Sequence, residues 1–217
     1  REYIIELAKK KKEPKWLLDL RLKGLKYWQK LEMPSWSPDI SGLNLDEILM
    51  YVETENELVS DWDKVPVEIK NTFEKLGIPE AEREHLAGVG AQYDSEVIYH
   101  NLKKRIAKKG VVYLPMEEAI QLTKKSKTEV ISQYGVDLSK MIKDHFMKLI
   151  TEKDHKFAAL HAAVWSGGSF IYIPKNVSVE IPIQSYYRLN APGAGQFEHT
   201  LIIVDEGSDL HFIEGCS

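Results

Sequence analysis

The chain has 217 residues, enough for one large domain or two small ones with a hydrophobic core. It is 43% hydrophobic and 29% charged with a net charge of −4, so its charge gives no reason to expect nucleic-acid binding. No apolar run approaches the roughly 18 residues that cross a bilayer, and the first residues lack a signal-peptide pattern. A single cysteine, Cys216, excludes an internal disulfide and agrees with a reducing compartment. We therefore expect a cytoplasmic globular protein without membrane association.

Residues 1–156 predict a mainly helical region. Amphipathic helices are expected in "PKWLLDLRLKGLKYWQKL", "VPVEIKNTFEKLG" and "YDSEVIYHNLKKRIAKKG", and further helical segments around 116–125 and 137–150. The first of these begins at a proline, which is typical of a first turn, and the second and third end at glycines, which are typical of helix C-termini. Asn44 is expected to cap a short helix from Leu45. Only "VVYLP" predicts a strand in this part of the chain.

The pattern changes after about Phe157. All but two of the 29 Lys and Arg residues lie before this point. Residues 176–183 alternate apolar and polar side chains, which is typical of a half-buried strand, and "GGSFIYIP", "HTLIIVDEG" and "SDLHFIEG" predict further strands. Short, closely spaced strands indicate a β-sandwich, a barrel or a β-solenoid, and periodicity does not choose among them. The fold class is therefore α+β, with domains at 1–156 and 157–217.

Two motifs suggest ligands without specifying them. "GVGAQYD" contains a Gly-x-Gly but lacks the third glycine of a dinucleotide fingerprint, so it favours a backbone turn before a helix. A cupin-like metal site would draw on four side chains near the C-terminal end: Glu198, His199, His211 and Glu214. The two histidines stand twelve positions apart, whereas a cupin normally has two histidines one residue apart.

Three further residues are candidates for chemistry. Arg188 and Asn190 share strand parity, so both would point to one face and could guide an anion or a polar sulfur species; a solvated face is the alternative. Cys216 is either an inert buried thiol or a reactive one.

Several collinear segments resemble SufB proteins, the scaffold subunits of the SUF iron–sulfur cluster assembly machinery. They are "EPKWLLDLRLKGL", "MPSWSPDISGLNLDEI", "EKLGIPEAEREHLAGVGAQYDSEVIYHNL", "AAVWSGGSFIYIPKNVSVEIPIQSYYRLN", "GQFEHTLIIVDEGS" and "IEGCS". The resemblance implies an N-terminal helical region followed by the first rungs of a right-handed parallel β-helix. It also implies a scaffold subunit that is not itself an enzyme, with ATP hydrolysis carried out by its partner SufC.

The resemblance also implies roles for particular residues. Cys216 matches the cysteine of the family's "GC-S/T-AP" motif, and Arg188 and Asn190 match its "Y-x-R-x-N" pair. In the family these residues are proposed to line a path inside the β-helix along which sulfur moves toward a nascent cluster. Cys216 would then be a transient ligand of iron or of the cluster. A neighbouring cation such as Arg188 would lower the pKa of the Cys216 thiol and favour that role.

The partners and cofactors are likewise implied by the resemblance. The expected partners are the SufC ATPase, SufD or a second SufB, and a cysteine desulfurase system as sulfur donor. The expected cofactors are a transient iron–sulfur cluster and reduced flavin in the complex. Because the match stops inside a family motif at Ser217, we expect a truncated chain without the SufC-docking segment. The alternatives are a SufD-like structural or iron-acquisition subunit and a cupin-like metalloprotein; "GVGAQYDSEVIYH" and "EGCS" favour SufB over SufD.

Overall fold

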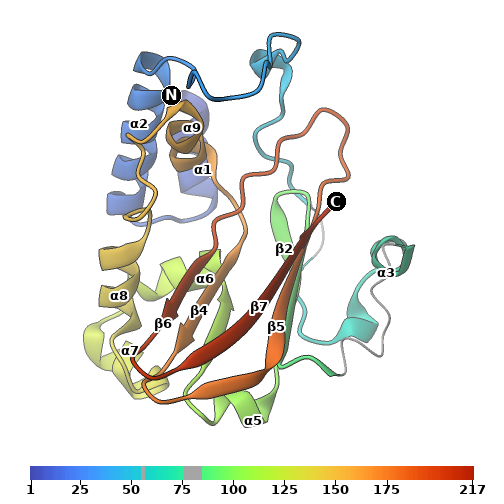
Figure 1. Ribbon diagram of the computed structural model, residues 1–217, viewed down its shortest axis with the longest axis vertical. Helices are drawn as coiled ribbons and strands as arrows, with labels where there is room; N and C mark the ends of the chain where they lie inside the picture. The colour runs from blue at the N-terminus through green and yellow to red at the C-terminus, as the bar shows by residue number, and fades with distance from the viewer. Residues whose placement is uncertain (55–56, 76–84) are drawn as a thin grey trace. The chain divides into compact units, whose positions relative to one another are not determined.

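The chain forms two compact units, each built from separate stretches of sequence. The computed structural model describes residues 1–54, 57–75 and 85–217 (Figure 1). Unit 1 comprises Arg1–Tyr51, Glu117–Ser166 and Gly195–Phe197, and unit 2 comprises Val52–Met116, Gly167–Ala194 and Glu198–Ser217. The expected division into a mainly helical region at 1–156 and the start of a β-helix at 157–217 stays a prediction.

Unit 1 is helical. Its helices are α1 (Glu2–Lys10), α2 (Lys15–Lys30), the 3-10 helix η1 (Leu45–Glu47), α6 (Met116–Leu122, which starts at the unit boundary), α7 (Lys127–Tyr134), α8 (Leu138–His145) and α9 (Lys156–Val164). Side chains that accept backbone hydrogen bonds start several of them, including Asn44 at η1, Ser126 at α7 and His155 at α9. Ser126 and Glu129 form a complete capping box, which fixes where α7 begins.

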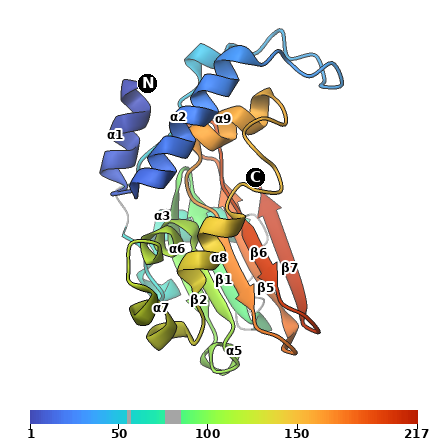
Figure 2. The same cartoon turned by 90° about the vertical axis from the view of Figure 1, so that its left-hand side faces the viewer.

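Helices α2 and α9 pack closely in unit 1 (Figure 2). Gly24 makes this approach possible, because a Cβ at that position would lie 2.8 Å from the Ala159 carbonyl oxygen. One turn earlier Arg21 is fully buried; its guanidinium forms an ion pair with Glu13 at 2.6 Å and donates to the carbonyl oxygens of Ala163 and Trp165. The apolar residues of α9 complete the core, so α2 contributes both apolar contacts and one compensated charge.

Unit 2 contains two sheets and few helices. Its elements are η2 (Trp62–Lys64), α3 (Val67–Lys75), β1 (Gly88–Tyr93), β2 (Glu96–Leu102), α5 (Lys104–Ala107), β3 (Val112–Pro115), β4 (Ser169–Ile173), β5 (Ser178–Arg188), β6 (Leu201–Val204) and β7 (Asp209–Cys216). One sheet has the strand order β2-β1-β5-β7 and the other β3-β4-β6. β4 lies beside β6 and β5 beside β7 (Figure 1).

The chain passes alternately between these two sheets. From β4 it enters β5 in the other sheet, returns to β6, and crosses again to β7, and each strand pairs in parallel with the strand two places further on. The antiparallel pairs are β1 with β2 and β3 with β4. Apolar side chains from both sheets form one core, among them Tyr113, Ile171 and Ile183. A second cluster packs α3 against the other face of β1.

The structure confirms several predicted elements and corrects others. The alternation at 176–183 overlaps the first half of β5, "VVYLP" contains β3, and helices lie within 116–125 and 137–150. The helix predicted for "YDSEVIYHNLKKRIAKKG" is wrong, since most of it is strand β2 followed by the single-turn helix α5. "GVGAQY" is likewise strand β1, rather than a turn before a helix. The C-terminal end expected for the "VPVEIKNTFEKLG" helix lies outside the described residues.

The observed fold is mixed α and β, as expected, with parallel pairing among strands β4 to β7. These strands therefore do not form an antiparallel meander. Among the helices that the structure describes, none combines the length and the apolar character that a membrane span requires.

Candidate functional site

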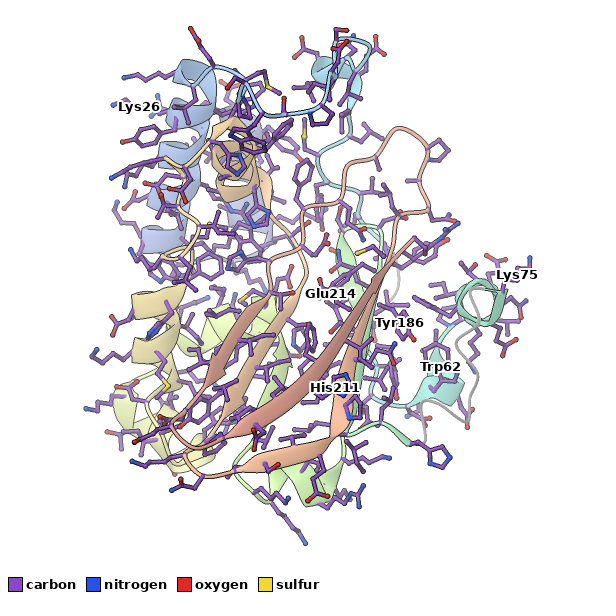
Figure 3. All side chains as sticks on the ribbon, in the orientation of Figure 1. Lys26, Trp62, Lys75, Tyr186, His211 and Glu214 are labelled. Atoms are coloured by element: carbon purple, nitrogen blue, oxygen red, sulfur yellow. The ribbon has the colours of Figure 1, made fainter. Side chains whose placement is uncertain are left out.

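Cys216 lies at the end of β7, paired with Tyr187 of β5. Its thiol is free and solvent-exposed, so the buried, inert alternative does not apply. Glu214 stands two positions earlier on the same strand and therefore shares its face (Figure 3). The thiol sulfur lies 3.9 Å from Oε1 of Glu198, to which it donates a long hydrogen bond. The fold thus places one thiol beside two carboxylates, Glu214 from β7 and Glu198 from the segment before β6.

These carboxylates set the protonation of the thiol. Partial burial raises the pKa of Cys216, and the charges of Glu198 and Glu214 together with the hydrogen bond to Glu198 raise it further. The pKa of Glu214 is also raised, by burial and then by the charge of Glu198. This is the opposite of the lowered thiol pKa expected beside Arg188. In the free protein at neutral pH, Cys216 is a protonated thiol rather than a thiolate.

Arg188 is not brought to the side of the thiol. In β5 the side chains alternate, so Tyr187 shares a face with Cys216, whereas Arg188 pairs with Tyr93 and shares a face with Tyr186. Tyr93 and Tyr186 pack in the apolar cluster that includes α3. Nε of Arg188 is buried and makes no hydrogen bond within the described part of the chain. The side chains of Arg188 and Cys216 therefore lie on opposite faces of the sheet.

Asn190 follows the end of β5 and is exposed. Its backbone N–H donates to Oδ1 of Asp94 at 2.7 Å, and the N–H of Ala191 donates to the same oxygen at 2.8 Å. Asp94 itself has a left-handed backbone, with φ of 53°, and directly follows β1. The structure thus assigns the Asn190 backbone to a turn held by Asp94. The roles of Arg188, Asn190 and Cys216 in sulfur transfer stay predictions.

The space between the two sheets contains a chain of hydroxyl groups that the sequence analysis missed. The Tyr113 hydroxyl lies 2.7 Å from Oγ of Ser185, which lies 2.9 Å from Oγ of Ser169. Ser169 continues to the Tyr187 hydroxyl at 3.2 Å, and Tyr187 to Oγ1 of Thr200 at 3.2 Å. Burial raises the pKa of Tyr187 to about 12, so its hydroxyl stays neutral. The parity of "IPIQSYYR" could have indicated this feature, because Ser185 and Tyr187 alternate with outward positions.

A small cavity adjoins these hydroxyls. Its volume is about 10 Å³, which suffices for about one water molecule, and its lining includes Gln92, His100 and Ser169. The Gln92 amide nitrogen donates to the Asp94 carbonyl, and its amide oxygen accepts from the Gly168 N–H. Burial lowers the pKa of His100 to about 4, so the ring is neutral near pH 7. The interior of unit 2 is therefore polar but uncharged at this point.

The cupin-like ligand set does not form a metal centre. Within residues 1–54, 57–75 and 85–217, no group of three or more His, Cys, Asp or Glu side chains could hold a metal ion. His211 is exposed on β7 (Figure 3), and the parallel pairing of β5 with β7 differs from the antiparallel sheets of a cupin.

No protein-family model matches the chain. Among curated proteins it is 48% identical over 212 residues to an iron–sulfur cluster assembly SufBD family protein of Staphylococcus aureus strain MRSA252. It is 47% identical over 212 residues to a protein of the same description from Staphylococcus haemolyticus strain JCSC1435. Each alignment covers 98% of this chain and 42% of the relative. The chain thus spans less than half the length of these relatives, and their shared name does not separate SufB from SufD. Over nearly its whole length, the chain is homologous to iron–sulfur cluster assembly proteins of the SufBD family.

Proposed function

We propose that this chain is part of a SufB-like scaffold on which an iron–sulfur cluster is assembled. The homology carries the proposal, and its chemical support is the exposed Cys216 thiol with Glu198 and Glu214 beside it. On this proposal the strands β4 to β7 are the first coils of a right-handed parallel β-helix. The alternation of the chain between two sheets, with parallel pairing at each return, supports that assignment.

The raised pKa of Cys216 suits a site that responds to a cation. A thiol must lose its proton to bind iron, and carboxylates that disfavour an isolated thiolate stabilise a cation bound to that thiolate. When Fe²⁺ binds, the S–H bond is replaced by an S–Fe bond and the proton leaves to solvent, with no change of oxidation state. In that step Glu198, to which the thiol already donates a hydrogen bond, would take up the proton and release it to solvent. Cys216 therefore stays protonated until its cargo arrives.

The whole complex would contain the partners that the resemblance implies. These are the ATPase SufC, SufD or a second SufB, and a cysteine desulfurase as sulfur donor, with reduced flavin as electron source. The chain itself would be a cytoplasmic scaffold without an enzymatic reaction of its own. A SufD-like structural or iron-acquisition subunit is the second candidate, because the name of the similar proteins covers both subunits.

The test uses the complete subunit in its complex. Cys216→Ser should reduce the cluster absorbance that develops after anaerobic reconstitution with iron and sulfur donor, and it should leave the melting temperature nearly unchanged because Cys216 is exposed. Glu198→Gln removes one charge from beside the thiol, and we expect faster alkylation of Cys216 near pH 8. Glu180→Gln, the same change at an exposed position of β5, is its matched control. Full cluster yield in the Cys216→Ser complex would exclude the thiol from assembly and favour the SufD-like alternative.

A further inference from the structure

Unit 1 contains a groove that the proposed chemistry does not use. Its volume is about 530 Å³, which lies within the range of protein ligand pockets. Helix α2 contributes Trp16, Asp19, Leu20 and Lys23, which have the spacing of a single helix face. The other side of the groove comes from α8 and the segment that follows it.

The floor of the groove is apolar and fixed in place. Trp16 and Phe146 stack edge to face, with ring centroids 5.8 Å apart, and Leu20 lies one turn from Trp16. Nε1 of Trp16 donates to Oγ1 of Thr123 at 3.2 Å, which satisfies the indole and holds its ring in position. A well-ordered aromatic and aliphatic floor is typical of a surface that receives apolar side chains.

The rim of the groove has an unbalanced positive charge. Asp19 is paired with Lys15 at 2.8 Å, and Lys23 is paired with Glu152 at 2.6 Å. The remaining two charges on the rim, Lys143 and Lys148, form no ion pair with any residue that the structure describes. The rim of the groove therefore has a net positive charge, from Lys143 and Lys148, around an apolar floor.

The apolar surface continues beyond the rim. Leu149 and Ile150 follow Lys148 directly, and they are 94% and 68% exposed. Adjacent large aliphatic side chains with such exposure are unusual on a free surface and often mark a contact with another macromolecule. A small anionic ligand in the groove would leave both uncovered, whereas a helix or loop of a partner protein would reach them.

We propose that this groove, formed by α2 and the end of α8, binds an acidic amphipathic helix of a partner protein. The apolar face of such a helix would lay two or three side chains on Trp16 and Leu20, above the buried Phe146. Its flanking carboxylates would pair with Lys143 and Lys148, and its outer edge would cover Leu149 and Ile150. A second copy of this chain is a poorer occupant, because a symmetric contact would bring these lysines against their own copies.

The test measures the binding of synthetic helical peptides to the 217-residue chain by fluorescence anisotropy. The probe is a peptide of about five turns with leucines on one face and glutamates beside it, and the comparison peptide has lysines in place of the glutamates. We expect the acidic peptide to bind, and to bind more weakly as salt is raised. The basic peptide should not bind.

Charge-reversed variants locate the binding. Lys143→Glu with Lys148→Glu should weaken the acidic peptide about tenfold, whereas Lys26→Glu with Lys30→Glu should change its affinity less than about twofold. Lys26 and Lys30 are exposed on the same helix α2 but do not line the groove. Lys26 is labelled in Figure 3. Thermal melts of both variants establish that each is folded.

Three outcomes would overturn the proposal. One is the absence of acidic-peptide binding at concentrations up to about 1 mM, and another is equal weakening by the two variant pairs. The third is binding of phosphatidylserine-containing vesicles, but not of the acidic peptide, with loss in the Lys143 and Lys148 variant. That last result would assign the groove to a membrane surface.

Discussion

The two units stabilise their buried polar groups in different ways. Unit 1 buries a full charge, since the guanidinium of Arg21 has no solvent exposure and depends on Glu13 and on two backbone carbonyl oxygens. Unit 2 buries neutral hydroxyls, which share hydrogen bonds along a chain from Tyr113 to Thr200. A buried charge loses most of its compensation when one partner is removed, whereas a hydroxyl chain loses one link at a time. The two units should therefore differ in their sensitivity to single substitutions.

The largest expected effect tests this difference in unit 1. Arg21→Met leaves the Glu13 carboxylate buried without a cation, so we expect the free energy of unfolding to fall by about 3–5 kcal/mol in urea denaturation. Adding Glu13→Gln to this variant should recover part of the loss, because the uncompensated charge is gone. Lys15→Met, which breaks the exposed pair with Asp19, is the control and should cost less than about 1 kcal/mol. Equal costs for Arg21→Met and Lys15→Met would contradict the assignment.

The second prediction uses one buried histidine from each unit. Burial lowers the pKa values of His100 in unit 2 and His161 in unit 1 to about 4, with Arg21 contributing to the second. Both folded pKa values lie below the unfolded histidine pKa of about 6.5. Between these two pKa values the unfolded chain therefore binds more protons than the folded chain. Stability should therefore be full above about pH 6.5 and fall as the pH drops toward 4, by about 2 kcal/mol for each histidine at pH 5.

Histidine variants identify the source of that pH dependence. His100→Gln and His161→Gln should each flatten the decline in denaturation midpoint between pH 7 and pH 5. His211→Gln, at an exposed position of β7, should leave it unchanged. A slope that persists in the variant lacking both buried histidines would place its origin in other groups.

The smallest effect is expected in the hydroxyl chain of unit 2. Tyr113→Phe removes the group that contacts Oγ of Ser185 and donates to the Gln184 carbonyl at 3.2 Å. We expect a loss of about 1–2 kcal/mol in urea denaturation, because Ser185 keeps its contact with Ser169. Tyr3→Phe, at a half-exposed position, should be nearly neutral. A loss as large as that of Arg21→Met would remove the contrast between the units.

Local sequence patterns predict only those helices and strands whose burial pattern is visible within a short stretch of sequence. The alternation at 176–183 predicts part of β5 because one face of that strand is buried and the other is not. The amphipathic pattern predicts a helix over Glu96–Leu102, which is strand β2, although Val97, Ile98 and Tyr99 are β-branched or aromatic and favour a strand. Its partner β1 also pairs with β5, which lies nearly a hundred residues later. No local window contains that contact.

The surroundings of Cys216 could likewise be predicted only in part from local sequence. Parity on one strand predicts that Glu214 and Cys216 share a face, so one of the two carboxylates beside the thiol was within reach of the sequence. Glu198 comes from outside any strand, and only the folded chain brings its carboxylate within 3.9 Å of the sulfur. The lowered Cys216 pKa expected from Arg188 is wrong because Cys216 pairs with Tyr187 of β5. Arg188 is the next residue after Tyr187, so its side chain lies on the opposite face of the sheet.

The number of residues that separates paired positions of β5 and β7 changes along the two strands. This change bears on where residues could be added to or lost from the chain. Val179 pairs with Leu210, 31 positions later, whereas Ile183 pairs with Phe212, 29 positions later. The difference is two residues, the smallest that leaves every inward side chain inward, since an odd change would exchange the two faces. Additions and losses of two residues within this pair of strands keep every side chain on its face. A single one needs a β-bulge, such as the one-residue register shift between β1 and β2, or a place in a turn.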